Sequence, residues 1–198
     1  MVLATLVASG ACSSSESPVA DSGHRGLAFD TVSEVAAGGD FAVVFEVLSE
    51  RDFGYSDVQR PADGSPPSSP PSVPDEDYIG RVVHVAVETV VWSDGEHVAP
   101  AEFEFVNSGW QLRDGARRVP ADSSWSWVEV GERYFGVFSD FGGEIGPMSM
   151  DAIYQLDGDQ LIEVSAVGGP DEFEGATLPE VSELLGLARD ELLNVDAP

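Results

Sequence analysis

The stretch from Arg81 to Trp92 constrains the fold most strongly, because it alternates with a period of two along its whole length. Its even-numbered positions mix polar and apolar side chains, whereas its odd-numbered positions are β-branched throughout: Val83, Val85, Val87, Thr89 and Val91. β-Branched residues are stiff at χ1 and pack well on a pleated surface, so this pattern is typical of a long strand with one buried face. We therefore expect a central strand in a small, mainly β domain.

Further strands are indicated on both sides of this stretch. In residues 41–50 the apolar side chains fall on one side of the expected strand, and Glu46 and Glu50 fall on the other. Residues 130–138 contain a turn followed by a strand. Residues 152–164 read as a hairpin around Asp157–Gly158, a favoured two-residue turn.

Residues 101–107 have the clearest division into an inner and an outer face. Phe103 and Phe105 are expected to point inward, while Glu102 and Glu104 point outward to solvent. The alternation of aromatic and acidic side chains predicts a strand with one buried face.

Two capping boxes predict where helices begin. In Thr31–Glu34 and Thr177–Glu180, the Thr hydroxyl and the Glu carboxylate can satisfy free amides at a helix start. The first helix is expected to be short, because Gly38–Gly39 follows within about two turns. The second helix, at residues 178–194, has apolar residues at helical spacing, and we expect this face to pack on the sheet or barrel: Val181, Leu184, Leu185, Ala188 and Leu192.

A proline-rich segment at residues 55–77 interrupts the strands without dividing the chain. Its prolines prevent it from pairing as a strand or continuing a helix. Because residues 27–54 alone are too few to bury a core, we interpret 55–77 as a disordered insertion in one domain that spans residues 27–198.

The first residues are similar to the end of a bacterial lipoprotein signal peptide. Residues 1–11 form a short apolar run, and Gly10-Ala11-Cys12 matches the core of a lipobox, in which the cysteine carries the lipid. The run has no positively charged segment before it, and Ser9 stands where a Leu-like residue is usual. A start codon upstream of Met1 would explain the missing charge. The alternative is an ordinary terminus with an incidental cysteine.

This resemblance predicts where the protein resides. Residues 1–11 are expected to be a truncated signal peptide, and residues 12–26, rich in Ser, Gly and Asp, a flexible tether. The lipid on Cys12 would hold the domain at the outer face of the cytoplasmic membrane.

The charge of the chain excludes several kinds of partner. There are 36 acidic residues against 9 basic ones, all of them Arg, and the net charge is −27. Such a surface repels nucleic acid and anionic bilayers. A GC-rich genome and adaptation to high salt both produce this composition, and we favour the first.

The sequence carries no recognisable catalytic or metal-binding motif. A single cysteine rules out an intramolecular disulfide and a Cys-based metal cage, and the three histidines lack ligand-like spacing. Asp157 and Asp159 could contact calcium weakly, but solvated loop acids are the simpler interpretation. We therefore expect no enzymatic activity, no cofactor and no metal site.

One segment stands out as a candidate binding surface. Residues 110–127 contain three of the four tryptophans and three of the nine arginines: Trp110, Arg113, Arg117, Arg118, Trp125 and Trp127. Exposed Trp with Arg is typical of binding hot spots and of surfaces that stack on sugars. The alternative is that the indoles cover an open end of the barrel while the arginines pair with nearby acids.

Residues 31–165 together resemble a known class of domain. A strand, a long loop, a strand ending in Val90-Val91-Trp92-x-x-Gly95 and a later strand with Val130-Gly-Glu-Arg-Tyr-Phe135 resemble actinobacterial exported proteins with OB-like barrels. The layout is also similar to netrin-like and metalloprotease-inhibitor-like domains. The resemblance implies a five-stranded OB-like Greek-key barrel, and the capping boxes add a short N-terminal helix and a C-terminal amphipathic helix to it. Because this chain has no second cysteine, the disulfides and the cysteine-based protease inhibition of netrin-like domains are not implied.

These observations combine into a hypothesis about function. We expect a non-enzymatic, lipid-anchored extracytoplasmic protein that binds an envelope protein or a cell-wall glycan. The alternatives are an envelope hydrolase without a recognisable motif and a structural surface protein without a ligand.

Overall fold

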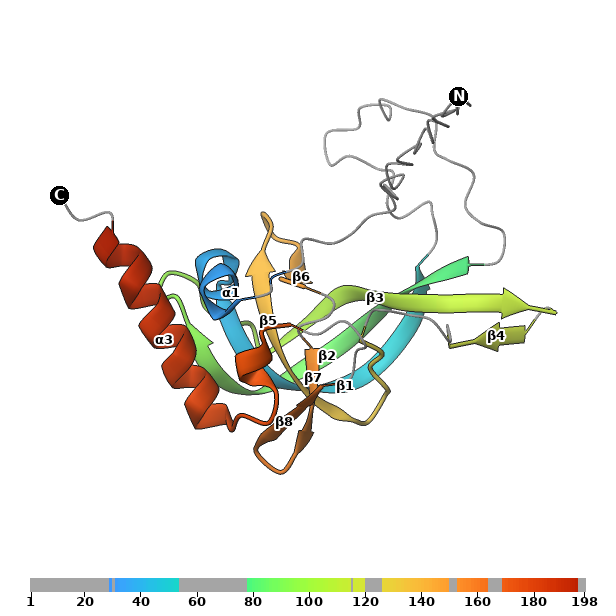
Figure 1. Ribbon diagram of the computed structural model, residues 1–198. Coiled ribbons are helices and arrows are strands. Elements are labelled where there is room, and N and C mark those ends of the chain that lie inside the picture. Colours follow the sequence, from blue (N-terminus) through green and yellow to red (C-terminus); the bar gives the residue numbers. More distant parts are fainter. Residues whose placement is uncertain are drawn as a thin grey trace, which may run out of the picture.

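The computed structural model describes residues 29, 31–53, 78–114, 116–119, 126–149, 153–163 and 169–195, and they form a mainly β structure (Figure 1). The strands are β1 (Phe41–Phe53), β2 (Tyr78–Ser93), β3 (Glu102–Arg113), β4 (Ala116–Arg118), β5 (Arg133–Asp140), β6 (Ile145–Pro147), β7 (Ile153–Asp157) and β8 (Gln160–Glu163). The helices are α1 (Val32–Gly38), the 3₁₀ turn η1 (Asp171–Phe173) and α3 (Leu178–Val195).

The strands form one antiparallel sheet in the order β4-β3-β2-β1-β5-β7-β8, with β6 paired to β5. The expected mainly β class is confirmed. The expected five-stranded OB-like barrel is not confirmed, because the described residues form eight strands in a sheet that does not close into a barrel. The stretch 81–92 lies within β2 as a long strand, but the middle position belongs to β1, which pairs with β2 and β5.

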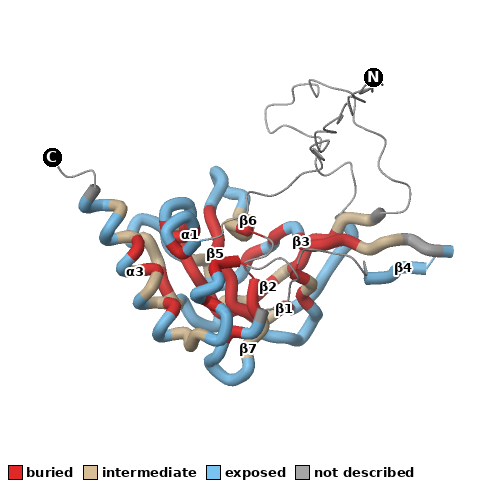
Figure 2. Tube along the Cα trace, in the orientation of Figure 1, coloured by how far each residue is buried: buried red, intermediate tan, exposed pale blue. Residues whose placement is uncertain are grey.

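The first half of β1 is buried on both faces, so it separates two hydrophobic clusters. Phe41, Val43 and Phe45 belong to one cluster, and Ala42 between them belongs to the other. Successive side chains of a strand point to opposite faces, so the two clusters lie on opposite sides of the sheet. Figure 2 shows buried residues along the middle strands, while β4 is exposed.

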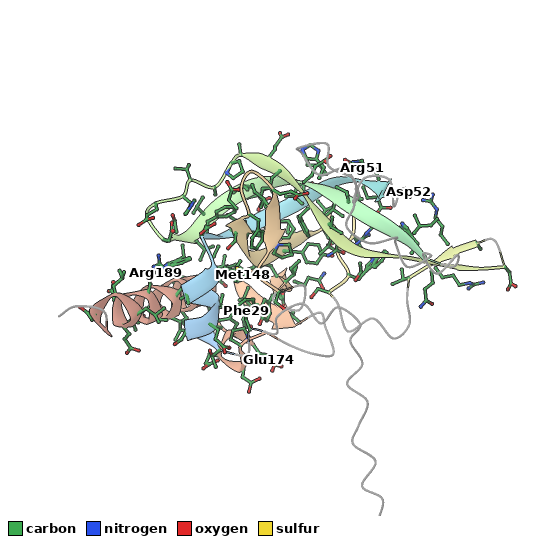
Figure 3. The ribbon with its side chains drawn as sticks, turned by 90° about the horizontal axis from the view of Figure 1, so that it is seen from above. Phe29, Arg51, Asp52, Met148, Glu174 and Arg189 are labelled. Carbon is green, nitrogen blue, oxygen red and sulfur yellow. The ribbon has the colours of Figure 1, made fainter. Side chains whose placement is uncertain are left out.

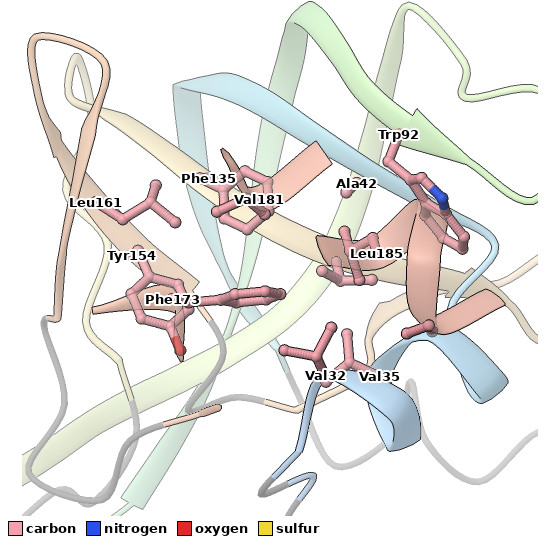
Figure 4. Close-up of a cluster of buried hydrophobic side chains, with 13 residues drawn as sticks. Val32, Val35, Ala42, Trp92, Phe135, Tyr154, Leu161, Phe173, Val181 and Leu185 are labelled. Carbon is pink, nitrogen blue, oxygen red and sulfur yellow. The ribbon is translucent and has the colours of Figure 1, made fainter. Parts of the chain in front are cut away.

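The outer cluster lies between the sheet and the helices (Figure 4). Val35 of α1 and Val181 and Leu185 of α3 pack there with Phe135 of β5 and Trp92 of β2. The apolar face of α3 therefore packs on the sheet and on α1, as its helical spacing predicts.

The inner cluster is built from aromatic side chains on the concave face. Phe138 of β5 contacts Phe103 and Phe105 of β3, with ring centroids 4.9 and 5.2 Å apart. Phe45 of β1 contacts the same ring at 5.6 Å. Strands β5 and β3 are not neighbours in the sheet, so these contacts require the sheet to curl strongly. The predicted inward direction of Phe103 and Phe105 is confirmed.

The predicted capping box is complete at α1, and at α3 hydrogen bonds to the Glu180 carboxylate are present. The Thr31 hydroxyl accepts from the Glu34 amide, and Glu34 accepts from the Thr31 amide. At α3, the Thr177 amide and hydroxyl donate to the Glu180 carboxylate, each at 2.8 Å. Gly39 follows α1 at a site where a Cβ would lie 2.8 Å from the Val35 carbonyl oxygen.

Two local expectations were wrong. A bulge between Val47 and Ser49 shifts the register of β1, so Glu50 pairs opposite Val83 and faces inward instead of lying with Glu46. In the last hairpin, Asp157 pairs with Gln160, so the turn residues are Gly158 and Asp159. Gly158 has φ of 70°, a value that glycine adopts without strain.

Several predicted segments lie outside the described residues: the leader 1–11, the tether 12–26 with Cys12, and the insertion 55–77. Among the described helices, none combines the length and apolar character needed to cross a bilayer.

The inner cluster is predicted to hold the curled sheet together. Replacing Phe138→Ala should lower the free energy of unfolding by about 3–5 kcal/mol, because the cavity lies among four other phenylalanine rings. Urea denaturation followed by circular dichroism measures this change. The matched variant Phe141→Ala removes a ring that is 66% exposed and should change the free energy by less than about 0.5 kcal/mol. Equal effects of the two variants would contradict this account.

Candidate functional site

A cleft of about 750 Å³ opens along the line where the curled sheet fails to close. Its walls are residues 103–106 of β3 and residues 141 and 143–147 of the β5–β6 hairpin, with Arg51 and Val82 beside them. We call this space the seam cleft. It is a candidate site because binding sites are generally concave, largely apolar and edged by a few polar groups.

The seam cleft lies between the edges of β3 and β6, which face each other and form no ladder among the residues that the structure describes. Strand β3 pairs with β2 along one edge, but along the other edge it pairs with β4 only from Gln111 to Arg113. Strand β6 pairs with β5 alone and lies beside β3. In the described part of the chain, residues 102–106 of β3 therefore have no strand partner on this edge.

The walls of the seam cleft are mainly apolar. Phe105 is buried at its base, and Ile145 packs against the inner cluster. Nearer to solvent, Val106 is 43% exposed and Phe141 is 66% exposed. An apolar group entering the cleft would cover both side chains.

Charged side chains stand at the rim. An Arg51 nitrogen donates to a Glu104 carboxylate oxygen at 2.9 Å, and both side chains are about half exposed (Figure 3 labels Arg51). This hydrogen bond lowers the pKa of Glu104 below its ordinary value of 4.5. Glu144 of the hairpin is also exposed, so the rim carries two carboxylates and one guanidinium.

The structure places two of the predicted tryptophans, Trp110 and Trp127, together. Both contact Arg81, a residue that sequence reasoning missed. The rings of Trp110 and Trp127 meet edge to face at 4.7 Å. The buried guanidinium of Arg81 lies 3.7 Å from the Trp127 centroid and 5.6 Å from that of Trp110. Such cation–π contacts are attractive, more so where water is excluded.

Polar partners surround Arg81 as well. It donates to a Glu50 carboxylate at 2.9 Å and to the Asn107 amide oxygen at 2.6 Å. Asn107 in turn donates to the Ser126 carbonyl at 3.3 Å. The signal in the sequence was the odd position of Arg81, which places it on the inward face of β2 with Val83.

None of the other predicted binding residues that the structure describes takes part in the cation–π contacts with Arg81. Arg117 of β4 forms an exposed ion pair with Asp52 of β1, and Arg118 is exposed. Arg113 lies in β3, and Trp125 lies outside the described residues. The role of the segment 110–127 in binding stays a prediction.

A second polar group joins the β2–β3 loop to the rest of the fold. His97 Nδ1 lies 2.9 Å from a carboxylate oxygen of Asp94 and 3.3 Å from one of Asp40. Arg189 of α3 reaches to within 4.0 Å of Asp94. These two acids and the imidazole have the spacing of metal ligands, although Asp94 Oδ1 already accepts from the Glu96 and His97 amides.

The charges of this group reinforce one another. The hydrogen bond from His97 Nδ1 to the Asp94 carboxylate raises the pKa of His97 above its ordinary value of 6.5. Partial desolvation lowers this pKa, and the negative charges of Asp40 and Glu96 raise it further. Burial raises the pKa of Asp94, but hydrogen bonds from His97 and Glu96 outweigh it and leave this pKa below its ordinary value. The group therefore acts as an ion pair that holds the loop.

Comparisons of the chain with protein-family models, with curated proteins and with solved structures find no match.

The ion pair predicts a pH dependence of stability. Because the folded pKa of His97 is raised, its contribution is complete below about pH 6.5 and is lost as the pH rises through the folded pKa. His97→Gln should remove this decline, as measured by thermal unfolding at a series of pH values. The matched variant His84→Gln leaves the ion pair intact and should keep the decline. A decline that persists unchanged in His97→Gln would contradict the assignment.

Proposed function

We propose that the protein is a non-enzymatic binding protein, held at the outer face of the cytoplasmic membrane by a lipid on Cys12, and that it binds its partner in the seam cleft. The observation that carries this proposal is the combination of an apolar cleft with a strand edge that no described strand pairs with. Strand edges are ready templates for pairing, and natural proteins usually cover or block them. Leaving one beside an apolar cleft favours a binding role.

The rival function is hydrolysis, and the chemistry of the seam cleft argues against it. Its lining among the described residues contains no histidine, serine or cysteine, so it offers no nucleophile paired with a base. Two carboxylates, Glu104 and Glu144, remain as an acid pair of the glycosidase kind. However, a general acid needs a raised pKa, whereas Arg51 lowers that of Glu104.

Kinship with exported OB-like barrel domains remains part of the proposal. The inner cluster draws its strand residues from five strands, β1, β2, β3, β5 and β7. This arrangement supports the idea of a five-stranded barrel-like core that is open at the seam. The proposed lipid anchor is supported by the lipobox-like Gly10-Ala11-Cys12 alone.

The anchor is tested by membrane fractionation of cells that produce the chain behind a complete signal peptide. Cys12→Ala should move the protein from the membrane fraction to the soluble fraction, because a covalently bound acyl chain supplies the membrane affinity. The matched variant Ser13→Ala should stay with the membrane. Unchanged membrane association of Cys12→Ala would contradict the anchor.

The seam cleft is tested by titrating the chain with envelope proteins and with cell-wall oligosaccharides and following intrinsic fluorescence or heat. Val106→Asn should weaken any binding by about tenfold, because it places a polar amide where an apolar group is covered. Leu193→Asn, on the exposed side of α3, is the matched control and should bind as the wild type does. If every ligand that binds the wild type binds Val106→Asn equally well, the seam cleft is not the binding site.

A further inference from the structure

We propose that the occupant of the seam cleft is an extended, cationic polypeptide segment that pairs with the free edge of β3. This inference rests on the proposed function and goes further, since it names the chemistry of the partner. It draws on three features of the described residues: the backbone edge, the apolar walls and the acidic charge.

Along the edge of β3 that faces the seam cleft, the backbone N–H and C=O groups are spaced for hydrogen bonds to another strand. Along an antiparallel strand, alternate residues direct their N–H and C=O groups to alternate sides. On one side of residues 102–106, these groups pair with β2, where Phe105 lies opposite Val83 and Phe103 opposite Val85. On the other side, no described strand pairs with them. An extended polypeptide can supply these hydrogen bonds by strand addition.

The β5–β6 hairpin, which forms the other wall of the seam cleft, is short enough to move aside for an added strand. Some Cα atoms of β3 and β6 lie within 8 Å of each other, whereas a strand between them needs about 4.8 Å on each side. The β6 ladder to β5 consists of only three residue pairs, from Ile145 to Pro147. Its turn contains Gly142 and Gly143, both with positive φ. Binding is therefore expected to move β6 outward while β3 stays fixed against β2.

The walls select the side chains of the incoming segment. A strand paired with β3 directs every second side chain toward the same face as Phe103 and Phe105, where the cleft is apolar. Val106 lies with Glu104 on the opposite face of β3, so its exposed part would be covered by the alternate side chains of the segment. The alternate side chains point toward the rim.

The charge at the rim and on the whole chain favours a cationic segment. Arg51 neutralises Glu104, so the carboxylate of Glu144 leaves the rim with a net negative charge. The chain as a whole has a net charge of −27. Electrostatic attraction would draw a basic segment toward the cleft and repel a second copy of this acidic chain.

A glycan fits this cleft less well. Sugars stack on exposed aromatic faces, and the described lining offers no tryptophan or tyrosine for this purpose. The described pair Trp110 and Trp127 instead contacts Arg81, outside the lining residues. Polypeptide is therefore the class of partner that the edge and the walls both favour.

The test uses the full chain carrying Cys12→Ser and three end-blocked peptides of about seven residues, the length of a short strand. The first alternates Arg and Val. The second has the same sequence with alternate backbone amides N-methylated, which keeps the charge but removes donors. The third alternates Glu and Val. We expect the first to bind, and each of the other two to bind at least about tenfold more weakly in isothermal titration calorimetry.

Hydrogen exchange supplies an independent readout. The Arg-Val peptide should slow exchange of the amides in residues 102–106 and leave those of α3 unchanged. Glu144→Gln should weaken its binding, whereas Glu183→Gln, on α3 and away from the seam cleft, should not. Added salt should reduce the affinity for the Arg-Val peptide without abolishing the difference from the N-methylated peptide.

Each contrary result has a defined meaning. Equal binding of the Arg-Val and N-methylated peptides would show electrostatic adhesion without strand pairing and would overturn the inference. Failure of the Arg-Val peptide to bind, together with a different ligand whose binding is lost in Val106→Asn, would overturn the inference and leave the proposed function standing. If no ligand at all is sensitive to Val106→Asn, both are wrong.

Discussion

The burial of β1 on both faces is the constraint on which the rest of this structure depends. A strand with solvent on one side needs one apolar face, but the first half of β1 supplies two, with Phe41 and Val43 inward and Ala42 and Val44 outward. Each face must be covered by something else. The helices cover the outer face, and the sheet covers the inner face by curling until the aromatic rings of β3 and β5 meet across it.

The curl explains the seam cleft. Covering the inner face of β1 brings β3 and β6 close to each other, but a three-residue strand cannot form a long ladder with β3. The hydrophobic contacts among Phe103, Phe105 and Phe138 are satisfied without closure. The sheet therefore gains most of its buried area while one backbone edge is left without a strand partner in the described residues, and this combination makes the edge available to another chain.

How much of this could be predicted from the sequence depended on the range of the interactions. The capping box at Thr31, the hydrogen bond from the Thr177 amide to Glu180, and the directions of Phe103 and Phe105 follow from neighbours within a few residues, and the structure confirms them. The inward position of Glu50 could not be predicted, because a bulge in β1 depends on pairing with a strand some 30 residues away and has no local signature. The seam cleft depends on the curl of the whole sheet and on an edge of β3 that no strand of the described residues pairs with, and no local pattern encodes either.

The acidity of the chain is compatible with an open strand edge for a physical reason. A long edge with apolar neighbours normally invites pairing between identical chains and hence aggregation. Here Glu102 and Glu104 lie on the edge strand, and every copy carries the same excess of negative charge, so an approaching copy is repelled before hydrogen bonds can form. A basic segment meets no such barrier. In the proposed interaction, the charge that disfavours self-association would also make the edge selective, because it would admit a partner according to the sign of its charge and leave the backbone and the apolar walls to complete the recognition.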